Sequence, residues 1–297
     1  MTQSRHFLFG DKMIVDTSKK ILIVGLGLIG GSYAKALRKL GFKISAITLN
    51  REDIDYAIEN GIIDEGFTKP LPEVLEKAEL VIFALYPKVF VEWIEKYQKF
   101  LKPGALLTDV TGVKASVVYK IQEMLRPDVE FIAAHPMAGK EVYGVQNSDP
   151  KIFHGANYIV TPTEKNSDSA IKDCLELGRL MGFNNVSILS PEKHDEMIGF
   201  VSQLTHCIAV SLMNCYDGEK LQDYTGDSFR DLTRIARIND EMWSELFLLN
   251  KETLLDQMDK FLAEFEKLRK TLETGDRETM REMMKVSTAR RALFDKK

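Results

Sequence analysis

The sequence predicts an α/β domain with a mostly parallel sheet, followed by an all-α domain. Its 297 residues are about twice the length of a typical single domain, which indicates two domains. Short apolar runs alternate with helical stretches up to Leu189, as in a parallel sheet that helices cover on both faces. After Leu189 such runs stop, and the remaining segments have helical spacing. We therefore expect an α/β domain over residues 1–189 and an all-α domain over residues 190–297.

The regular pattern of the first domain begins at Lys20, after an N-terminal extension over residues 1–18. Within this extension, a Gly10-Asp11 pair between two apolar segments predicts a small hairpin. Helices are expected over Leu28–Leu40 and Glu52–Asn60. Strands are expected over Lys20–Val24, Ile44–Asn50, Leu80–Leu85, Leu106–Val110, Phe131–Ala134, Asn157–Val160 and Val186–Leu189.

The second domain opens at Ser190-Pro191-Glu192, which combines an N-cap hydroxyl, a proline in the first turn and an early acid. Breaks between its helices are expected near 217–226 and at Gly275. Its clearest helix carries apolar residues at alternating spacings of four and three, which form one seam. This seam predicts either a homodimer contact or packing within the chain, and it consists of Leu254, Met258, Phe261, Phe265, Leu268 and Leu272.

Composition indicates a globular protein of a reducing compartment. The net charge of −4 offers no basic face for a nucleic acid. The three cysteines contain no CxxC pair, so we expect neither disulfides nor structural zinc. Residues 1–16 lack the long apolar core of a signal peptide, and the run Leu80–Tyr86 is too short to span a membrane. We therefore expect a cytoplasmic protein whose partners include neither nucleic acid nor membrane.

A glycine-rich turn joins the first strand to the first helix. Gly25, Gly27 and Gly30 form the pattern GxGxxG, with Leu28 and Ile29 between the last two glycines. The first glycine permits a tight turn, the second lets a pyrophosphate approach the backbone, and the third lets helix and strand pack closely. The helix N-terminus adds a positive field. The position between strand and helix predicts a Rossmann-like dinucleotide site, with a glycine turn that binds nothing as the alternative.

The end of the second strand bears on which dinucleotide binds. An NAD-binding strand usually ends in an acid that binds the ribose hydroxyls, but this position is Thr48 or Asn50. Arg51 follows and could attract a 2′-phosphate. We therefore favour NADP over NAD as the cofactor. The alternative is that Arg51 is a solvated residue that Glu52 neutralises.

His135 is the principal candidate for proton transfer. It ends the apolar run Phe131–Ala134, and ligands of open α/β sheets bind at the carboxyl ends of strands. An imidazole there can take a hydroxyl proton, although it can also simply cap the strand end. His194 and His206 lie on the first helix of the second domain without metal-ligand spacing, so we expect no metal. Asp109 also ends a strand, where capping the next turn is the expected role.

Three arginines cluster on one helical segment of the second domain. Spacings of four and three place Arg234 beside both Arg230 and Arg237. Three neighbouring guanidinium groups repel one another unless anions compensate. The compensation comes either from an anionic ligand or from a surface ion-pair network with Asp227, Asp231 and Asp240.

Together these motifs resemble the prephenate dehydrogenases of tyrosine biosynthesis and the related arogenate dehydrogenases. The resemblance runs from about Lys20 to Trp243 through VGLGLIGGSYAKAL, TDVTGVK, HPMAGKEVYGV, SPEKHDEMIGFVSQLTH and TRIARINDEMW. It implies oxidative decarboxylation of prephenate to 4-hydroxyphenylpyruvate with hydride transfer to NAD(P)+. It also implies a Rossmann-like domain, a helical domain that forms a homodimer, and an active site in the cleft between them.

The resemblance also assigns roles to individual residues. His135 matches the catalytic histidine that contacts the C4 hydroxyl, and Arg234 matches the arginine that holds a substrate carboxylate. Glu141 matches an acid near the mouth of the site, and His206 and Trp243 match residues of the substrate cleft. His194 matches a helix residue of less certain role.

Two departures from the family pattern leave the choice between prephenate and arogenate open. Gly112 stands where many members carry a serine, and Thr111 is the neighbouring candidate for its hydroxyl. Gln203 and Thr205 stand where some members have His-Leu-Pro-His. Two other classes compete: small hydroxyacid dehydrogenases with a catalytic lysine, and a dinucleotide-sensing regulator without turnover. We expect neither a regulatory domain after the helical part nor a chorismate mutase domain before residue 1.

Overall fold

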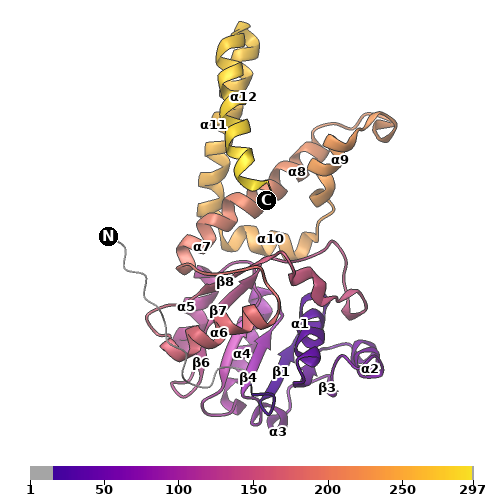
Figure 1. The fold of residues 1–297 in the computed structure, drawn as a ribbon, viewed down its shortest axis with the longest axis vertical. Helices are drawn as coiled ribbons and strands as arrows, with labels where there is room; N and C mark the ends of the chain where they lie inside the picture. The colour runs from indigo at the N-terminus through magenta and orange to yellow at the C-terminus, as the bar shows by residue number, and fades with distance from the viewer. Residues whose placement is uncertain (1–15, 296–297) are drawn as a thin grey trace.

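The computed structural model describes residues 16–295, so the hairpin expected around Gly10 lies outside the described residues. The chain forms two parts, which we call the sheet lobe (residues 16–189) and the helical lobe (residues 190–295). Figure 1 shows the sheet lobe below and the helical lobe above it, with α10 (Asp240–Leu249) lying across the top of the sheet lobe. The predicted order of an α/β part followed by an all-α part is confirmed.

The main sheet has six parallel strands in the order β3-β2-β1-β4-β5-β6, which is the Rossmann order. Every strand therefore ends at the same edge, and that edge faces the helical lobe (Figure 1). The short β3 has no apolar run, which is why the hydrophobic pattern does not predict it. The strands are β1 (Lys20–Val24), β2 (Lys43–Ile47), β3 (Glu65–Phe67), β4 (Leu80–Phe83), β5 (Leu106–Asp109) and β6 (Glu130–Phe131).

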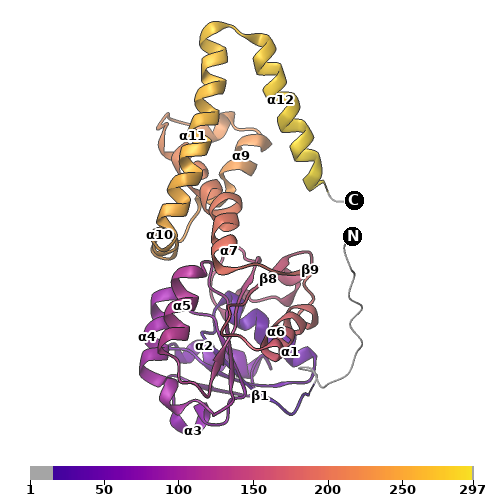
Figure 2. The ribbon, with the colours of Figure 1, turned by 90° about the vertical axis from the view of Figure 1, so that its left-hand side faces the viewer.

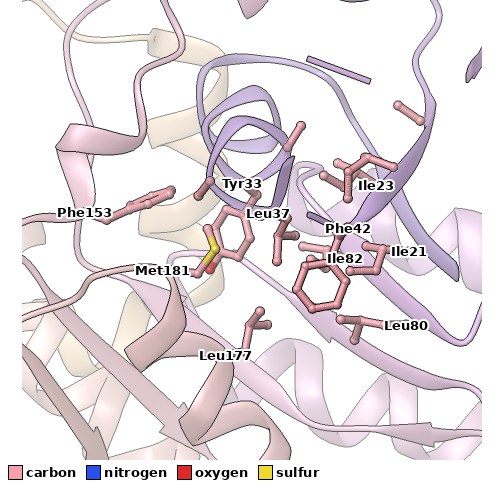
Figure 3. Close-up of a cluster of buried hydrophobic side chains, with 14 of the residues drawn as sticks. Ile21, Ile23, Tyr33, Leu37, Phe42, Leu80, Ile82, Phe153, Leu177 and Met181 are labelled. Carbon is pink, nitrogen blue, oxygen red and sulfur yellow. The ribbon is translucent and has the colours of Figure 1, made fainter. Parts of the chain in front are cut away.

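Helices cover both faces of this sheet, as the continuous apolar strands predict. Ile21 and Ile23 of β1 pack under α1 (Leu28–Lys39), together with Tyr33 and Phe42, and Figure 3 shows this cluster. Burial of each large apolar side chain contributes about 1.5–3 kcal/mol to the stability of the folded protein. The same face of the sheet is also covered by α2 (Arg51–Glu59) and α6 (Asp168–Leu180). The opposite face is covered by α3 (Pro72–Leu75), α4 (Pro87–Tyr97) and α5 (Ala115–Met124).

A second sheet extends the lobe and carries the candidate base. It consists of β7 (Ala133–Pro136), β8 (Asn157–Thr161) and β9 (Asn185–Ile188), with β7 antiparallel to β8. The single strand expected over Phe131–Ala134 is therefore divided between two sheets. The division occurs because the amide of Ala134 donates to the side chain of Asp109 (3.1 Å), not to the backbone of β5.

The helix predicted to start at Ser190 does so, since Ser190 Oγ accepts from the amide of Lys193 at 3.2 Å. One long helix combines α7 (Pro191–Ile198), a π-helical segment (Gly199–Leu204) and α8 (Thr205–Asn214). Gly275, with φ of +67°, ends α11 as expected. The other helices are α9 (Asp227–Thr233), α11 (Lys251–Thr274) and α12 (Arg277–Arg291), and 3₁₀ turns lie at Gln98–Phe100, Val145–Asn147, Pro150–Phe153, Leu221–Tyr224, Arg234–Ala236 and Ala292–Phe294.

Helices α11 and α12 form a hairpin that projects away from the sheet lobe (Figure 2). The apolar seam of α11 is covered only at its lower end: Leu254 is buried, whereas Phe265 and Leu272 are 59% and 66% exposed. The helix over Pro191–Asn214 passes a length-and-hydropathy test for a membrane span, which is weak evidence because core helices pass it too. Its polar contacts with the sheet lobe, described below, identify it as part of the fold.

Candidate active site

A cavity of about 600 Å³ lies between the two lobes at the carboxyl edge of the main sheet. The sheet lobe contributes the glycine turn, residues 84–87, residues 110–112 and residues 135–144. The helical lobe contributes residues from the Pro191–Asn214 helix and from residues 235–246. Both lobes are therefore needed to form it.

The glycine turn is shaped to receive a pyrophosphate. Gly25 has φ of +97°, and a Cβ there would collide with the carbonyl of Ala84. A Cβ on Gly30 would collide with the carbonyl of Gly25, whereas a Cβ on Gly27 would meet nothing within 4 Å. Helix α1 begins directly after Gly27, with no acid in its first turn. An open backbone surface at a helix N-terminus fits the phosphates of a dinucleotide.

At the end of β2, no carboxylate occupies the ribose-binding positions. Thr48 is half-buried, and its amide donates to the carbonyl of Phe67 at 3.1 Å. Asn50 caps α2 by accepting from the amide of Glu52 at 2.9 Å. Arg51 is exposed, and its guanidinium contacts Asp55 at 2.8 Å, one helical turn further on. Asp55, not Glu52, is thus the acid that neutralises Arg51.

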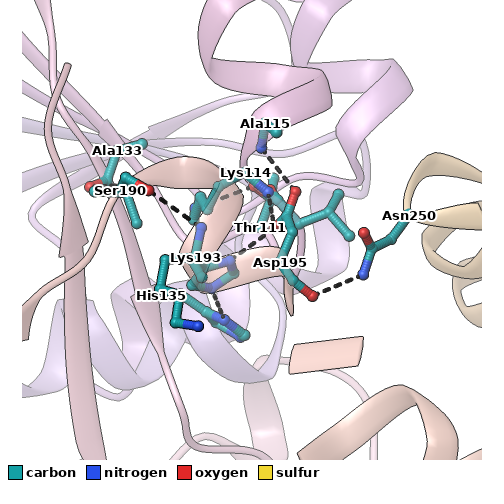
Figure 4. Close-up of polar contacts among 12 residues, drawn as sticks. Thr111, Lys114, Ala115, Ala133, His135, Ser190, Lys193, Asp195 and Asn250 are labelled. Carbon is teal, nitrogen blue, oxygen red and sulfur yellow. Dashed lines mark hydrogen bonds and ion pairs between the residues drawn. The ribbon is translucent and has the colours of Figure 1, made fainter. Parts of the chain in front are cut away.

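A chain of three side chains joins the lobes at His135. His135 Nδ1 lies 2.9 Å from His194 Nε2, and His194 Nδ1 lies 2.8 Å from the carboxylate of Asp195. The two carboxylate oxygens of Asp195 accept the backbone amides of Lys114 and Ala115, each at 2.8 Å (Figure 4). We call this arrangement the Asp–His–His chain.

The Asp–His–His chain fixes which nitrogen of each imidazole carries the hydrogen. A carboxylate can only accept hydrogen bonds, so the His194 nitrogen that faces Asp195 must be a donor. His194 Nδ1 therefore carries the hydrogen, and Nε2 is an acceptor. His135 Nδ1 must then donate to His194 Nε2. The lone pair of His135 Nε2 is left as a proton acceptor.

The environment keeps both imidazoles neutral. Burial lowers the pKa of His135 well below 6.5, and the nearby His194 and Lys114 lower that pKa further. Burial also lowers the pKa of His194, against the opposing effect of Asp195. A neutral His135 is in the state that a general base needs.

Beneath His135 lies a buried ion pair. Lys114 Nζ donates to Asp109 Oδ2 at 2.7 Å and to the carbonyl of Ala134 at 2.6 Å. Asp109 Oδ1 accepts from the amide of Ala134, so the ion pair binds both the amide and the carbonyl of the residue before His135. Burial lowers the pKa of Lys114, and the neighbouring Asp109 opposes that shift. Asp109 also accepts from the amide of Thr111 at 3.0 Å, the capping role expected from the sequence.

The position of Thr111 corrects the idea that it replaces the missing serine hydroxyl. Thr111 lines the cavity, but its hydroxyl faces the carboxylate of Asp109 and the carbonyl of Val113. The same oxygen accepts from Lys114 Nζ at 3.2 Å. Its single hydrogen is therefore directed into its own turn, so Thr111 is not a donor to a substrate.

An ion pair joins Glu141, which lines the cavity, to Arg234, which is not among the residues that line it. Arg234 belongs to the 3₁₀ turn after α9, and Glu141 belongs to the loop after β7, so the pair joins the lobes. Their side chains are 64% and 39% exposed. Of the predicted surface network, Arg230 contacts Asp227 at 2.6 Å.

The far wall of the cavity is aromatic. His206 stacks on Trp243 with ring centroids 3.7 Å apart and an angle of 28° between the planes. His206 Nδ1 lies 2.8 Å from the carbonyl of Ser202, so it is the donor and Nε2 is the acceptor. Burial lowers the pKa of His206. The π-helical segment before it brings Ser202 and His206 to the cavity, in line with the occurrence of π-helices at functional sites.

Two family models match consecutive parts of the chain. The nucleotide-binding domain of prephenate dehydrogenase matches residues 33–189, and the dimerization domain of prephenate dehydrogenase matches residues 190–286. The chain belongs to the prephenate dehydrogenase family. Its sheet lobe is accordingly a nicotinamide-dinucleotide-binding domain, and its helical lobe is the dimerization domain of an oxidoreductase.

Individual relatives agree with this family. A prephenate dehydrogenase of Bacillus subtilis (strain 168) is 33% identical over 268 residues, which are 88% of this chain and 72% of the relative. A cyclohexadienyl dehydrogenase of Zymomonas mobilis is 27% identical, covering 91% of this chain and 94% of the relative. The prephenate dehydrogenase of Aquifex aeolicus, solved with hydroxyphenyl propionate and NAD+, superposes with a TM-score of 0.85 at 33% identity, covering 93% of this chain and 98% of the other.

The two departures from the prephenate dehydrogenase pattern lie in different surroundings. A Cβ on Gly112 would make ordinary contact with Leu246, 3.4 Å away, so this position has room for a small side chain. Gln203 is buried, where its amide donates to the carbonyl of Leu246 at 3.2 Å and accepts from Asn250 at 2.7 Å. It joins helices within the lobe.

The sequence interpretation missed two residues of the site. Asp195 and Lys114 sit in the quoted motifs, yet neither had been given a role. The signal for Asp195 was its position directly after His194 on a helix that begins at the sheet. Among residues 16–295, no group of three or more His, Cys, Asp or Glu side chains could hold a metal ion.

Proposed function

We propose that this protein oxidises prephenate to 4-hydroxyphenylpyruvate and CO2, with reduction of a nicotinamide dinucleotide. The observation that carries the proposal is the lone pair of His135 Nε2, which the Asp–His–His chain leaves free beside a dinucleotide-shaped glycine turn. The prephenate dehydrogenase relatives from Bacillus and Aquifex support the choice of substrate.

His135 is the general base in this proposal. Its Nε2 accepts the proton of the C4 hydroxyl as hydride leaves C4, and it returns this proton to the phenolate oxygen once the ring carboxylate has left as CO2. A nicotinamide dinucleotide held at the glycine turn would supply the acceptor for the hydride that the substrate loses. Because the product ring is aromatic, the reaction is favourable, and the residues of the cavity mainly orient the substrate and balance its charge. His194 and Asp195 hold the base in the required tautomer.

Arg234 binds a substrate carboxylate. A guanidinium can form a bidentate pair with a carboxylate, and the carboxylate of Glu141 already occupies this position in the structure. A substrate carboxylate would take the place of Glu141, which lines the cavity, and Arg234 would then turn toward the bound substrate. His206 and Trp243 form the flat wall against which the substrate ring packs.

NADP is the proposed preferred cofactor. The absence of an acid at Thr48 and Asn50 removes the repulsion of a 2′-phosphate, and the exposed Arg51 offers a cation. In Arg51→Asp, we expect the kcat/KM with NADP+ to fall about tenfold relative to NAD+, the loss of one charge-assisted bond. Lys43→Asp, at the other end of β2, is the control. A parent enzyme that uses both cofactors equally contradicts this preference.

The substrate is tested by following absorbance near 340 nm with prephenate or arogenate and with NAD+ or NADP+. Turnover of prephenate above arogenate is the expected result. Faster turnover of arogenate would assign the protein to the arogenate branch, and dinucleotide binding without turnover of either would indicate a regulator.

We further infer that residues 1–189 and 190–297 are the two domains and that the protein acts in the cytoplasm. The meeting of the two family models at residues 189 and 190 supports the boundary. Three free cysteines, one of them the buried Cys174, support a reducing compartment.

A further inference from the structure

The three arginines of residues 230–237 have different surroundings. Arg230 pairs with Asp227, and Arg234 pairs with Glu141. Within residues 16–295, the guanidinium of Arg237 has neither an ion pair nor a hydrogen bond, yet Arg237 lines the cavity between the lobes. An unpaired guanidinium facing a ligand cavity is a candidate for binding an anion.

The backbone next to Arg237 is attached to the sheet lobe. Asn239 caps α10 and donates from Nδ2 to the hydroxyl of Tyr86 at 3.1 Å. Further along α10, Glu245 accepts from the amide of Lys88 at 2.6 Å. Arg237, two residues before Asn239, is thereby held close to the loop between β4 and α4.

That loop lies against the glycine turn. The amide of Ala84 donates to the carbonyl of Val24 at 2.7 Å, and a Cβ on Gly30 would lie 3.2 Å from the Ala84 side chain. Tyr86 and the glycine turn line the same cavity. The contacts therefore run from the glycine turn through residues 84–86 to Asn239, and place Arg237 on the dinucleotide side.

The glycine turn supplies backbone donors but no cation. The first turn of α1 holds no charged residue, and the lysine or arginine that the sheet lobe contributes to the cavity lining is Lys140, in the loop after His135. A pyrophosphate carries two negative charges, and a planar guanidinium matches its oxygens in a bidentate pair.

We propose that Arg237 of the helical lobe binds the pyrophosphate of the dinucleotide across the cavity. This inference rests on the proposed dinucleotide site, but not on the identity of the substrate. The dinucleotide then contacts both lobes, and its affinity depends on a residue outside the nucleotide-binding domain.

The test measures dinucleotide affinity without substrate, by calorimetric titration of Arg237→Gln with NAD+, NADP+, ADP-ribose and AMP. We expect the Kd of NAD+, NADP+ and ADP-ribose to rise by roughly 10- to 100-fold, as for a lost hydrogen bond to a charged group. The Kd of AMP, which lacks a pyrophosphate, should stay unchanged. Arg237→Lys should recover part of the affinity, and Arg230→Gln, whose arginine pairs with Asp227, is the matched control.

Three results would overturn the proposal. The first is an unchanged Kd for ADP-ribose, whether or not the KM for prephenate rises. The second is a loss confined to NADP+, which would place Arg237 at the 2′-phosphate. The third is an equal loss for AMP. Because Arg237 is exposed, we expect its variants to fold like the parent protein. An unchanged circular dichroism spectrum checks this. If the parent binds dinucleotides but turns over no prephenate, the proposed function fails, whereas the inference on Arg237 is still decided by the Kd values of Arg237→Gln.

Discussion

The chemistry of His135 depends on its contacts more than on its position at a strand end. Burial, His194 and Lys114 lower its pKa and so keep it neutral, and His194 Nε2 accepts a hydrogen bond from its Nδ1. One nitrogen with a free lone pair therefore faces the cavity. A histidine that merely capped a strand would not need an imidazole partner from another lobe.

Replacing His135 by Asn removes this acceptor. We expect kcat in His135→Asn to fall by about 10²–10⁴, the range for a lost general base, with dinucleotide affinity unchanged. Steady-state kinetics with saturating prephenate measures it. His154→Asn, at an exposed histidine that does not line the cavity, is the control. An undiminished kcat would remove His135 from the mechanism.

Replacing Arg234 by Ala should act mainly on binding. Loss of a charged pair costs about 2–5 kcal/mol, and the exposure of Arg234 favours the lower end, so we expect KM for prephenate to rise roughly 30-fold. Arg230→Ala, which removes only a surface pair with Asp227, should keep the parent KM. A parent-like KM in Arg234→Ala would instead make Arg234 a structural residue that pairs only with Glu141.

At the scale of elements, helix α7 connects the lobes chemically. It begins immediately after the sheet lobe and carries His194 and Asp195 in its first two turns. The sequence predicted the start of this helix from Ser190 and Pro191. It did not predict its contacts, because an i,i+1 His-Asp pair has no distinctive spacing and its partners lie about 60 and 80 residues earlier.

The same limit explains the other differences between expectation and structure. The glycine turn, the covered strands and the cap at Ser190 follow local rules, so their residues could be predicted. The division of Phe131–Ala134 into two strands depends on the side chain of Asp109, and the commitment of the Thr111 hydroxyl depends on Asp109 and Val113. The assignment of His135 and Arg234 came from the family resemblance, since position alone left each with a structural alternative.

Replacing His194 by Gln tests the chain of imidazoles through pH. The base must be neutral, and its pKa lies below 6.5, so parent kcat should persist as pH falls through 6.5 and drop only at more acidic pH. In His194→Gln the pKa of His135 rises because one source of its depression is gone. The acidic limb of the kcat profile should therefore move to higher pH. Lys193→Gln, on the outer face of α7, is the control and should leave the acidic limb of the kcat profile unchanged. If this limb is also unchanged in His194→Gln, the role of His194 is contradicted.

At the scale of the whole molecule, the helical lobe presents an apolar surface. Leu262, Phe265 and Leu272 of α11 are each more than half exposed in a single chain. Since the helical lobe is a dimerization domain, a second copy is the expected cover. The apolar seam of α11 would then have both of the roles that the sequence left open. It packs within the chain at Leu254, and further along it would contact a second subunit.

A charge within this surface should separate the subunits. We expect Phe265→Asp to sediment as a monomer at concentrations where the parent sediments as a dimer, because the carboxylate would be buried without a partner. Lys267→Asp places the same side chain on the opposite face of α11 and should remain dimeric. A dimeric Phe265→Asp would move the interface elsewhere.

The carboxylate of Asp195 has a second neighbour besides the imidazole: it accepts the first amides of α5, from Lys114 and Ala115, and so caps a helix of the other lobe. Replacing this one carboxylate by an apolar side chain would weaken the start of α5 and release His194 at the same time. The orientation of His194 and the start of a helix in the other lobe therefore depend on a single aspartate.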